Sequence, residues 1–296
     1  MLATLQKECD MTIRKAYRAG SFYPFDDDSC RQQIHECLGN YVPPAEPDTV
    51  VAGIVPHAGW IFSGSTAARV FKSIHQKASP ETFVIFGAVH VWGIGIAALF
   101  PKGSWETPCG SVAIDEALSG RLLDGVSDIL QADPSVHSHE HSIEVQIPFI
   151  QYLFPAAKIV PIMVSPDSQA MRLGERIGKI LAKENGSVIV LGSTDLTHYG
   201  PSFGFTPYGI GEEALQQMKA NDRRIIDLAL HMHAEAVVQE ASQHRNACGA
   251  GAIAATVAAA HALGAERGYL LEHTTSQDVM PERRAADAVG YASIIF

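Results

Sequence analysis

Short apolar runs recur along the chain and predict strands that are buried on both faces. The runs are continuous in apolarity rather than alternating, which is typical of a sheet that helices cover on both sides. They are residues 50–55, 82–86, 159–164, 187–191 and 289–295. The sequence therefore predicts a central sheet whose strands are largely buried.

Segments with helical periodicity lie between these runs. Apolar residues recur three and four positions apart over residues 63–75, 115–123 and 171–184. Strands that alternate with helices predict a three-layer α/β/α sandwich with a central mixed or mostly parallel sheet. The proline-rich segment 41–47 is expected to be a surface connection. Because no internal repeat or low-complexity block interrupts the pattern, we expect one domain over residues 1–296.

Composition and charge narrow the classes of function. Of the 296 residues, 47% are hydrophobic and 18% are charged, as in ordinary globular proteins. The formal net charge is −10 and no run of Lys and Arg stands out, so neither nucleic acid nor a membrane surface is expected as a partner. No apolar stretch is long enough for a signal-peptide core or a bilayer span. We therefore expect a cytoplasmic protein.

Five cysteines are scattered along the chain without a CxxC pair. They are Cys9, Cys30, Cys37, Cys109 and Cys248. An odd number at wide spacing argues against both a disulfide framework and a zinc ribbon. The pattern predicts reduced thiols, as in a cytosol.

Two of the predicted strands end in a histidine. His57 follows the strand 50–55, and His90 follows the strand 82–86. In α/β sheets, functional side chains gather just beyond the carboxyl ends of strands. A single histidine at such a position is more often structural, but the repetition at two strand ends favours a shared site.

A third predicted strand, 187–191, leads into Asp195 and His198. If the segment after the strand is helical, these two side chains share one face. Histidine suits proton transfer near neutral pH, and a neighbouring carboxylate fixes its tautomer. We predict His198 as an acid/base residue and Asp195 as its orienting partner. The alternative is that Asp195 caps a helix that carries His198.

Cys248 precedes an alanine-rich helical stretch, residues 250–263. Near a helix N-terminus the dipole favours the thiolate, although a buried apolar cysteine is the simpler alternative. A thiolate combined with imidazoles binds Fe, Cu or Zn better than Mg or Ca. His57, His90 and Cys248 are therefore the candidate metal ligands.

Three histidines alternate at His137, His139 and His141. They would share one face if the segment is extended, and they could line the same pocket, form another metal site or lie in a solvated loop. Of the three, His137 is the weakest candidate for a functional residue. His141 is the most interesting, because a helix is predicted to begin near residue 143.

Six motifs together resemble the Memo family in order and spacing, over nearly the whole chain. They are Ala16-Tyr17-Arg18-Ala19-Gly20-Ser21-Phe22-Tyr23-Pro24, Pro56-His57-Ala58-Gly59-Trp60, Gly87-Ala88-Val89-His90, Glu140-His141-Ser142-Ile143-Glu144, Ser193-Thr194-Asp195-Leu196-Thr197-His198-Tyr199-Gly200 and Ala247-Cys248-Gly249. Each motif is weak alone, but six in the same order make chance a poor explanation. The resemblance is to AmmeMemoRadiSam system protein B.

The resemblance implies the fold of the class III extradiol dioxygenases. It also implies that His57, His90 and Cys248 hold the metal, so a cysteine stands where those dioxygenases use a carboxylate. This difference weakens an inference of ring cleavage. The position of His198 is similar to the acid/base histidine of the dioxygenases, with Asp195 and His141 beside the same pocket. These three residues are the predicted catalytic set.

The metals associated with the family are Fe and Cu, and the associated activity is redox chemistry. Animal members are linked to motility signalling and phosphopeptide binding. Microbial members accompany a radical SAM protein and an AMMECR-type protein, which are therefore expected partners. The leading hypothesis is a metal-dependent oxidoreductase, with Fe(II) or Cu and with Zn as a further option, acting on a small organic substrate. The alternatives are a non-enzymatic metal-binding or peptide/protein-interaction protein, and a metallohydrolase.

Overall fold

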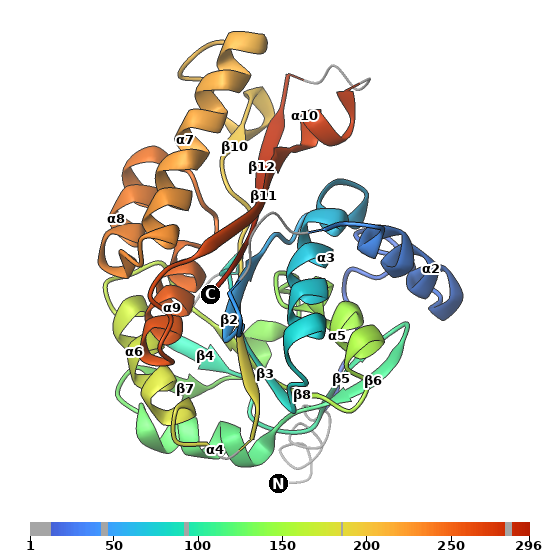
Figure 1. The fold of residues 1–296 in the computed structure, drawn as a ribbon, viewed down its shortest axis with the longest axis vertical. Helices are drawn as coiled ribbons and strands as arrows, with labels where there is room; N and C mark the ends of the chain where they lie inside the picture. Colours follow the sequence, from blue (N-terminus) through green and yellow to red (C-terminus); the bar gives the residue numbers. More distant parts are fainter. Residues whose placement is uncertain (1–12, 43–46, 92–94, 185, 282–285) are drawn as a thin grey trace, which may run out of the picture.

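A nine-stranded sheet forms the middle layer of the protein (Figure 1). The computed structural model describes residues 13–42, 47–91, 95–184, 186–281 and 286–296, so Cys9 and most of the segment 41–47 lie outside the described residues. The strands are β2 (Ala52–Val55), β3 (Thr82–Gly87), β4 (Ala97–Leu99), β7 (Leu130–Ala132), β8 (Lys158–Met163), β9 (Val188–Ser193), β10 (His198–Tyr199), β11 (Tyr269–Thr275) and β12 (Ala288–Ile295).

The centre of the sheet is parallel and its flanks are antiparallel. The strand order is β10-β12-β2-β9-β3-β8-β4-β7, and β11 also pairs with β12. Strands β2, β9, β3 and β8 run parallel to one another, and the edge strand β7 is parallel to β4. β12 is antiparallel to β2, and β4 is antiparallel to β8. The predicted mixed, mostly parallel sheet is therefore confirmed.

Helices cover both faces of the sheet, which confirms the predicted three-layer architecture (Figure 1). Their buried side chains form two large hydrophobic clusters, one on each face, and α7 contributes to a third, smaller one. One face carries α2 (Asp27–Leu38), α3 (Trp60–Lys77) and α5 (Ile147–Leu153). The other carries α4 (Glu116–Gly125), α6 (Ala170–Leu181), α7 (Glu212–Leu230), α8 (Ala234–His244) and α9 (Ala250–Ala262).

The predicted elements correspond to observed ones with small shifts at their ends. All five apolar runs form strands, and the periodic segments form α3, α4 and α6. Helix α4 begins after Asp115, because its carboxylate accepts a hydrogen bond from the backbone N–H of Leu118 at 3.0 Å. Helix α3 is longer than predicted and starts at Trp60, directly after the His57 motif.

The alanine-rich segment forms α9, which is buried between the sheet and α6. A Cβ atom at Gly174 of α6 would collide with the backbone oxygen of Ala255, so glycine is required for this close approach. Small residues on both helices thus let α9 lie deep in the molecule. The depth of α9 in turn places Cys248, which precedes it.

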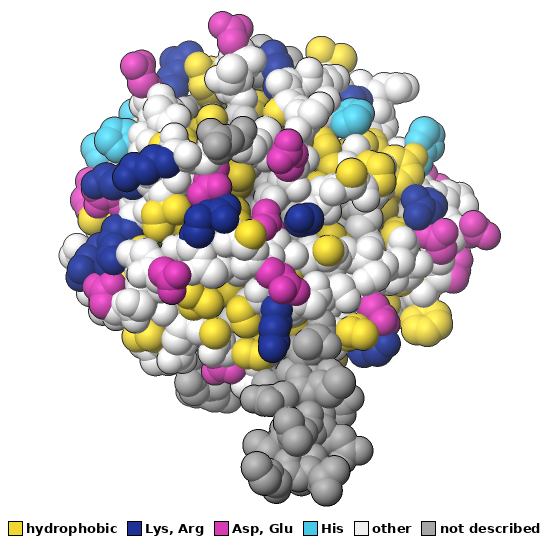
Figure 2. Space-filling view, turned by 90° about the horizontal axis from the view of Figure 1, so that it is seen from below, with side chains coloured by type: hydrophobic (Ala, Val, Ile, Leu, Met, Phe, Trp, Pro, Cys, Tyr) yellow, Lys and Arg dark blue, Asp and Glu magenta, His cyan; other side chains and the backbone are white. Residues whose placement is uncertain are grey.

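The chain also forms a second, smaller sheet. Strands β1 (Ile13–Arg14), β5 (Ser104–Thr107) and β6 (Gly110–Ala113) form a three-stranded sheet beside α5. Figure 2 shows acidic and basic side chains interspersed among apolar ones on the face that it draws. In the described part of the chain, every helix is too short or too polar to cross a membrane.

Candidate metal centre

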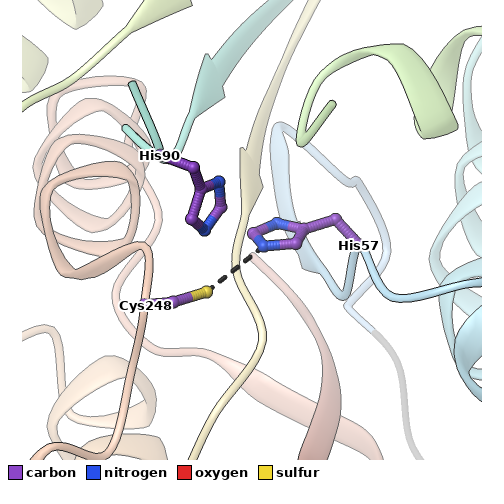
Figure 3. A group of neighbouring side chains, drawn as sticks. All are labelled: His57, His90 and Cys248. Carbon is purple, nitrogen blue, oxygen red and sulfur yellow. Dashed lines mark hydrogen bonds between the residues drawn. The ribbon is translucent and has the colours of Figure 1, made fainter. Parts of the chain in front are cut away.

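The order of the strands brings three predicted site segments together. His57 follows β2, His90 follows β3, and Asp195 follows β9, which lies between β2 and β3. All three strands are parallel, so their carboxyl ends share one edge of the sheet. Cys248 reaches the same edge from the turn before α9. In Figure 3, both imidazole rings and the Cys248 sulfur point toward one another.

The donor atoms of the three predicted ligands converge. The Cys248 Sγ lies 3.2 Å from Nε2 of His57. One ligand atom from each of His57, His90 and Cys248 lies within 4.8 Å of the other two. The backbone N–H of Asp195 also donates to the Cys248 sulfur at 3.3 Å, which favours a thiolate.

The hydrogen bonds of Ser193 determine the tautomer of His57. The Ser193 hydroxyl donates its only proton to the backbone oxygen of Ser142 at 2.6 Å. Its oxygen lies 3.1 Å from Nδ1 of His57 and can therefore only accept there. His57 thus carries its proton on Nδ1. Nε2 therefore faces Cys248 and is the nitrogen that would bind a metal in place of its proton.

A buried carboxylate orients His90 in the same way. Glu140 lies 3.1 Å from Nδ1 of His90 and also accepts from the backbone N–H groups of His90, His141 and Ser142. Burial opposes its ionisation, but these donors, led by His90, hold the pKa of Glu140 well below its ordinary value. The carboxylate therefore holds a proton on Nδ1 of His90, so Nε2 is the nitrogen that can bind a metal when its proton is displaced.

The charges of the centre suit a cation. Burial opposes ionisation of Cys248, but His57, His198 and His90 outweigh it and hold the pKa of this thiol well below its ordinary value. Burial also lowers the pKa of His90, but Cys248 and Glu140 outweigh it and raise that pKa to about 10. A metal cation would replace the protons of this cluster. A thiolate with two oriented imidazoles fits Fe, Cu or Zn, which bind softer donors than oxygen.

His141 lies beside the predicted ligands. Its ring stacks on His90, with centroids 4.8 Å apart, and meets the edge of His57 at 5.3 Å. Burial and the charge of His57 lower the pKa of His141 to about 3, so the imidazole is neutral at neutral pH. His90, Glu140 and His141 form a second group with ligand atoms within 4.8 Å.

Asp195 and His198 do not lie on one helix, which the sequence had left as an option. The segment continues extended along β12, because the backbone N–H of Leu196 donates to the Gly290 oxygen and the Gly290 N–H donates to the oxygen of Thr197. As a result, Asp195 Oδ2 lies 4.0 Å from Nε2 of His198, beyond hydrogen-bond distance. The helix-cap alternative for Asp195 is wrong for the same reason.

The Asp195 carboxylate instead positions the His57 loop. Its Oδ1 accepts from the backbone N–H of His57 at 2.7 Å and of Ala58 at 3.2 Å. Nε2 of His198 is buried and has no hydrogen-bond partner among the described residues. Burial lowers the pKa of His198, but Cys248 and Asp195 outweigh it, so this pKa is raised. His198 therefore has a ring nitrogen available for a bound molecule.

A cavity of about 420 Å³ opens in front of these groups. Its polar floor includes His57, His90, His141, Asp195 and His198. Its apolar walls include Phe22, Phe62, Phe203, Val289 and Tyr291. The volume and the mixture of apolar walls with a few convergent polar groups are typical of a small-molecule site.

The three alternating histidines do not share a face. Residues 135–137 form a short 3-10 helix, which rotates His137 into the core. There its Nε2 lies 3.1 Å from the backbone oxygen of Ala98, and the solvated-loop alternative is wrong for this residue. His139 is exposed and contacts Tyr17, while only His141 reaches the metal centre.

The roles of two buried acids and a serine were not predicted from the sequence. Glu140 and Ser193 orient the ligand histidines, and Glu144 accepts hydrogen bonds from the backbone of Tyr17 and Arg18. The available signals were a Glu directly before His141 and a hydroxyl at a strand end. Neither signal identifies a chemical role unless the segment that it contacts in the folded protein is known.

Comparisons with known proteins match this geometry to a family. The family model described as Memo-like protein matches residues 14–295. A MEMO1 family protein from Pyrococcus furiosus is 37% identical over 293 residues, covering 96% of this chain and 98% of that protein. A MEMO1 family protein from Thermococcus onnurineus is 37% identical over 298 residues, covering 96% of this chain and 99% of that protein.

A solved structure supports the fold alone. The crystal structure of an uncharacterized Escherichia coli protein superposes with a TM-score of 0.53 at 12% sequence identity. The superposition covers 83% of this chain and 99% of that one. The family model and the sequence relatives extend over nearly the whole chain and include every segment of the metal centre. The chain therefore belongs to the Memo family.

Proposed function

We propose that this protein is a metal-dependent oxidoreductase that acts on a small organic substrate in the cavity beside His57, His90 and Cys248. The observation that carries the proposal is the convergence of two oriented imidazoles, which line the cavity floor, with the Cys248 thiolate behind them. Fe or Cu bound by these residues would supply one-electron redox chemistry.

The cavity lining supports a substrate that is largely apolar and not phosphorylated. Aromatic side chains, including Phe22, Phe62 and Phe203, form much of the wall. Among the described lining residues there is no Lys or Arg, whereas Asp195 and Asp287 are present. Apart from the metal and the histidines beside it, the described lining offers a multiply anionic molecule no cationic partner, and its two carboxylates repel one. A neutral or cationic molecule of about one to two rings fits both the volume and the charge.

Two histidines handle protons in this proposal. His198 presents a buried Nε2 that has no hydrogen-bond partner in the described structure, and although burial lowers its pKa, Cys248 and Asp195 outweigh burial and raise that pKa. It can therefore donate to a substrate oxygen or nitrogen and take the proton back. His141 is neutral and can accept a hydrogen bond that orients the same substrate.

The first test is metal content by elemental mass spectrometry on protein purified without a His tag. The comparison includes His57→Ala, His90→Ala and Cys248→Ser, with His231→Ala as a matched control on the exposed surface. Near-stoichiometric Fe or Cu in the parent and the control, with loss in the three ligand variants, supports the proposal. A metal-free parent that also refuses Fe(II), Cu and Zn on anaerobic reconstitution overturns it.

The second test asks whether turnover requires an oxidant. Metal-loaded protein is screened against neutral and cationic aromatic compounds with dioxygen and under anaerobic conditions. Turnover that requires an oxidant supports the oxidoreductase. Equal turnover without any oxidant contradicts it.

A metallohydrolase remains the second candidate, because the same thiolate and imidazole donors also suit Zn. In that case Zn would supply Lewis-acid chemistry, and His198 would still move the proton. Turnover of a hydrolysable panel by Zn-loaded protein, with none by Fe- or Cu-loaded protein in the oxidant screen, would favour this candidate over the first.

A further inference from the structure

Two cysteines outside the metal centre meet where α2 contacts the hairpin of β5 and β6. Cys30 lies in the first half of α2 and is fully buried. Cys109 lies in the turn between β5 and β6 and is partly exposed. Their sulfur atoms are 3.5 Å apart, although 79 positions separate the two residues in the sequence. The tertiary structure thus creates a pair of thiols that cysteine spacing did not suggest.

The turn that carries Cys109 is held in place by hydrogen bonds. The backbone N–H of Cys109 donates to the Thr107 hydroxyl oxygen at 3.1 Å. That hydroxyl donates to Oε1 of Gln151 on α5, and Nε2 of Gln151 donates to the backbone oxygen of Gly110. Because α5 also packs against α2, the hairpin tip is held against the helix that carries Cys30.

The two thiols differ in reactivity. A hydrogen bond with Cys30 is the largest cause that lowers the pKa of Cys109, and Arg31 contributes. The pKa of Cys30 is raised by the same hydrogen bond and by burial. Cys109 is therefore the accessible thiol that ionises first, and Cys30 is placed to react with it second. On the same helix, burial raises the pKa of Cys37 to about 11.

We propose that Cys30 and Cys109 form a reversible disulfide when a low-molecular-weight disulfide acts as the oxidant. The Cys109 thiolate attacks one sulfur of the oxidant, whose S–S bond breaks and releases one thiolate. Cys30 then loses its proton and attacks the Cys109 sulfur, which releases the second thiol. Two protein thiols lose two electrons and two protons, and the oxidant is reduced to two thiols. A thiol reductant reverses both steps.

The proposed bond affects the wall of the cavity. The segment from Tyr17 to Tyr23 connects β1, which pairs with β5, to the start of α2, and it carries the lining residue Phe22. The disulfide would join the hairpin on one side of this segment to the helix on its other side. It therefore restrains the unfolding of this wall, and the oxidised protein is expected to have the higher Tm.

The test uses the full-length protein, incubated with oxidised glutathione, alkylated and digested with trypsin without reduction. Tryptic peptides 19–31 and 103–121 contain only Cys30 and only Cys109, respectively, so their cross-linked product is unambiguous. We expect this product in the parent and in the Cys37→Ser control, and its loss after dithiothreitol. In Cys30→Ser, the glutathione adduct is expected to persist on Cys109, because the second thiol is missing.

Two outcomes overturn the proposal. One is a parent protein that keeps both thiols free for alkylation while Cys30→Ser takes up glutathione at Cys109. The other is a Cys30→Ser protein in which glutathione does not react with Cys109. Cys30→Ala leaves no hydroxyl in the buried position and replaces the serine variant if that variant fails to fold.

Discussion

The carboxylate of Glu140 lies 3.1 Å from Nδ1 of His90, so Nε2 is the ring nitrogen on the side of Cys248 that can bind a metal. Glu140 therefore acts on the metal centre through His90, although it is not itself one of the residues that line the cavity. Because Glu140 also accepts three backbone N–H groups, it holds the His90 loop and the ring of His90 together. It is therefore a positioning residue of the centre.

Glu140→Gln is expected to weaken metal binding by about 10- to 100-fold, because an amide orients His90 less firmly and removes a charge that supports its basicity. The measurement is a competitive titration with a chelator. Glu235→Gln on the exposed surface is the matched control and should bind metal as the parent does. Parental affinity in Glu140→Gln would refute the positioning role.

His198→Gln is expected to keep the metal and to lose turnover by about 10²- to 10⁴-fold, because only proton transfer is removed. The measurements are elemental analysis and kcat with a substrate found in the oxidant screen. The pH profile of the parent should lose activity as pH rises through the raised pKa of His198, since the protonated form is the donor. A variant with parental kcat would show that His198 is not the acid/base residue.

His137 is expected to make the protein less stable in acid. Burial, followed by the charge of Arg14, lowers the pKa of His137 to about 3. In the unfolded chain this histidine therefore binds a proton near pH 6.5, whereas in the folded protein it stays neutral down to about pH 3. Its contribution to the free energy of unfolding is complete above about pH 6.5 and is lost as pH falls toward about 3. The loss amounts to about 1.4 kcal/mol per pH unit.

His137→Gln removes this titration. The difference in unfolding free energy between about pH 7 and about pH 5 should shrink by about 2 kcal/mol relative to the parent. The measurement is urea unfolding at both pH values. His231→Gln, at an exposed position, should leave the difference unchanged, and an unchanged difference in His137→Gln would count against the assignment.

Gly174→Ala is expected to destabilise the fold by about 1–3 kcal/mol, because the added methyl group meets the backbone of Ala255 and forces α6 away from α9. Gly120→Ala in α4 is the matched control. A Cβ there meets no atom of the described structure within 4 Å, so a gain of about 0.5–1 kcal/mol is expected from helix propensity. Urea unfolding measures both, and equal effects of the same sign would contradict the packing argument.

Local patterns predicted much of the fold and the identity of the candidate ligands. The strands that lead to His57 and His90 are buried on both faces, so their apolarity is continuous and easy to recognise. Other elements were missed because they are short or mixed in polarity, such as the β5–β6 hairpin and β11. The sequence left open whether the segment after β9 is helical, because its pairing with Gly290 depends on a strand almost a hundred residues away.

The sequence by itself determined which residues lie at strand ends, because periodicity and strand boundaries depend on neighbouring residues. It also determined, through its motifs, which family the chain resembles. Only the tertiary structure decided that β9 lies between β2 and β3, since strand order arises from hydrogen bonds between distant segments. That order brings His57 and His90 to the Cys248 sulfur. The same long-range packing, rather than any local pattern, places Cys30 against Cys109.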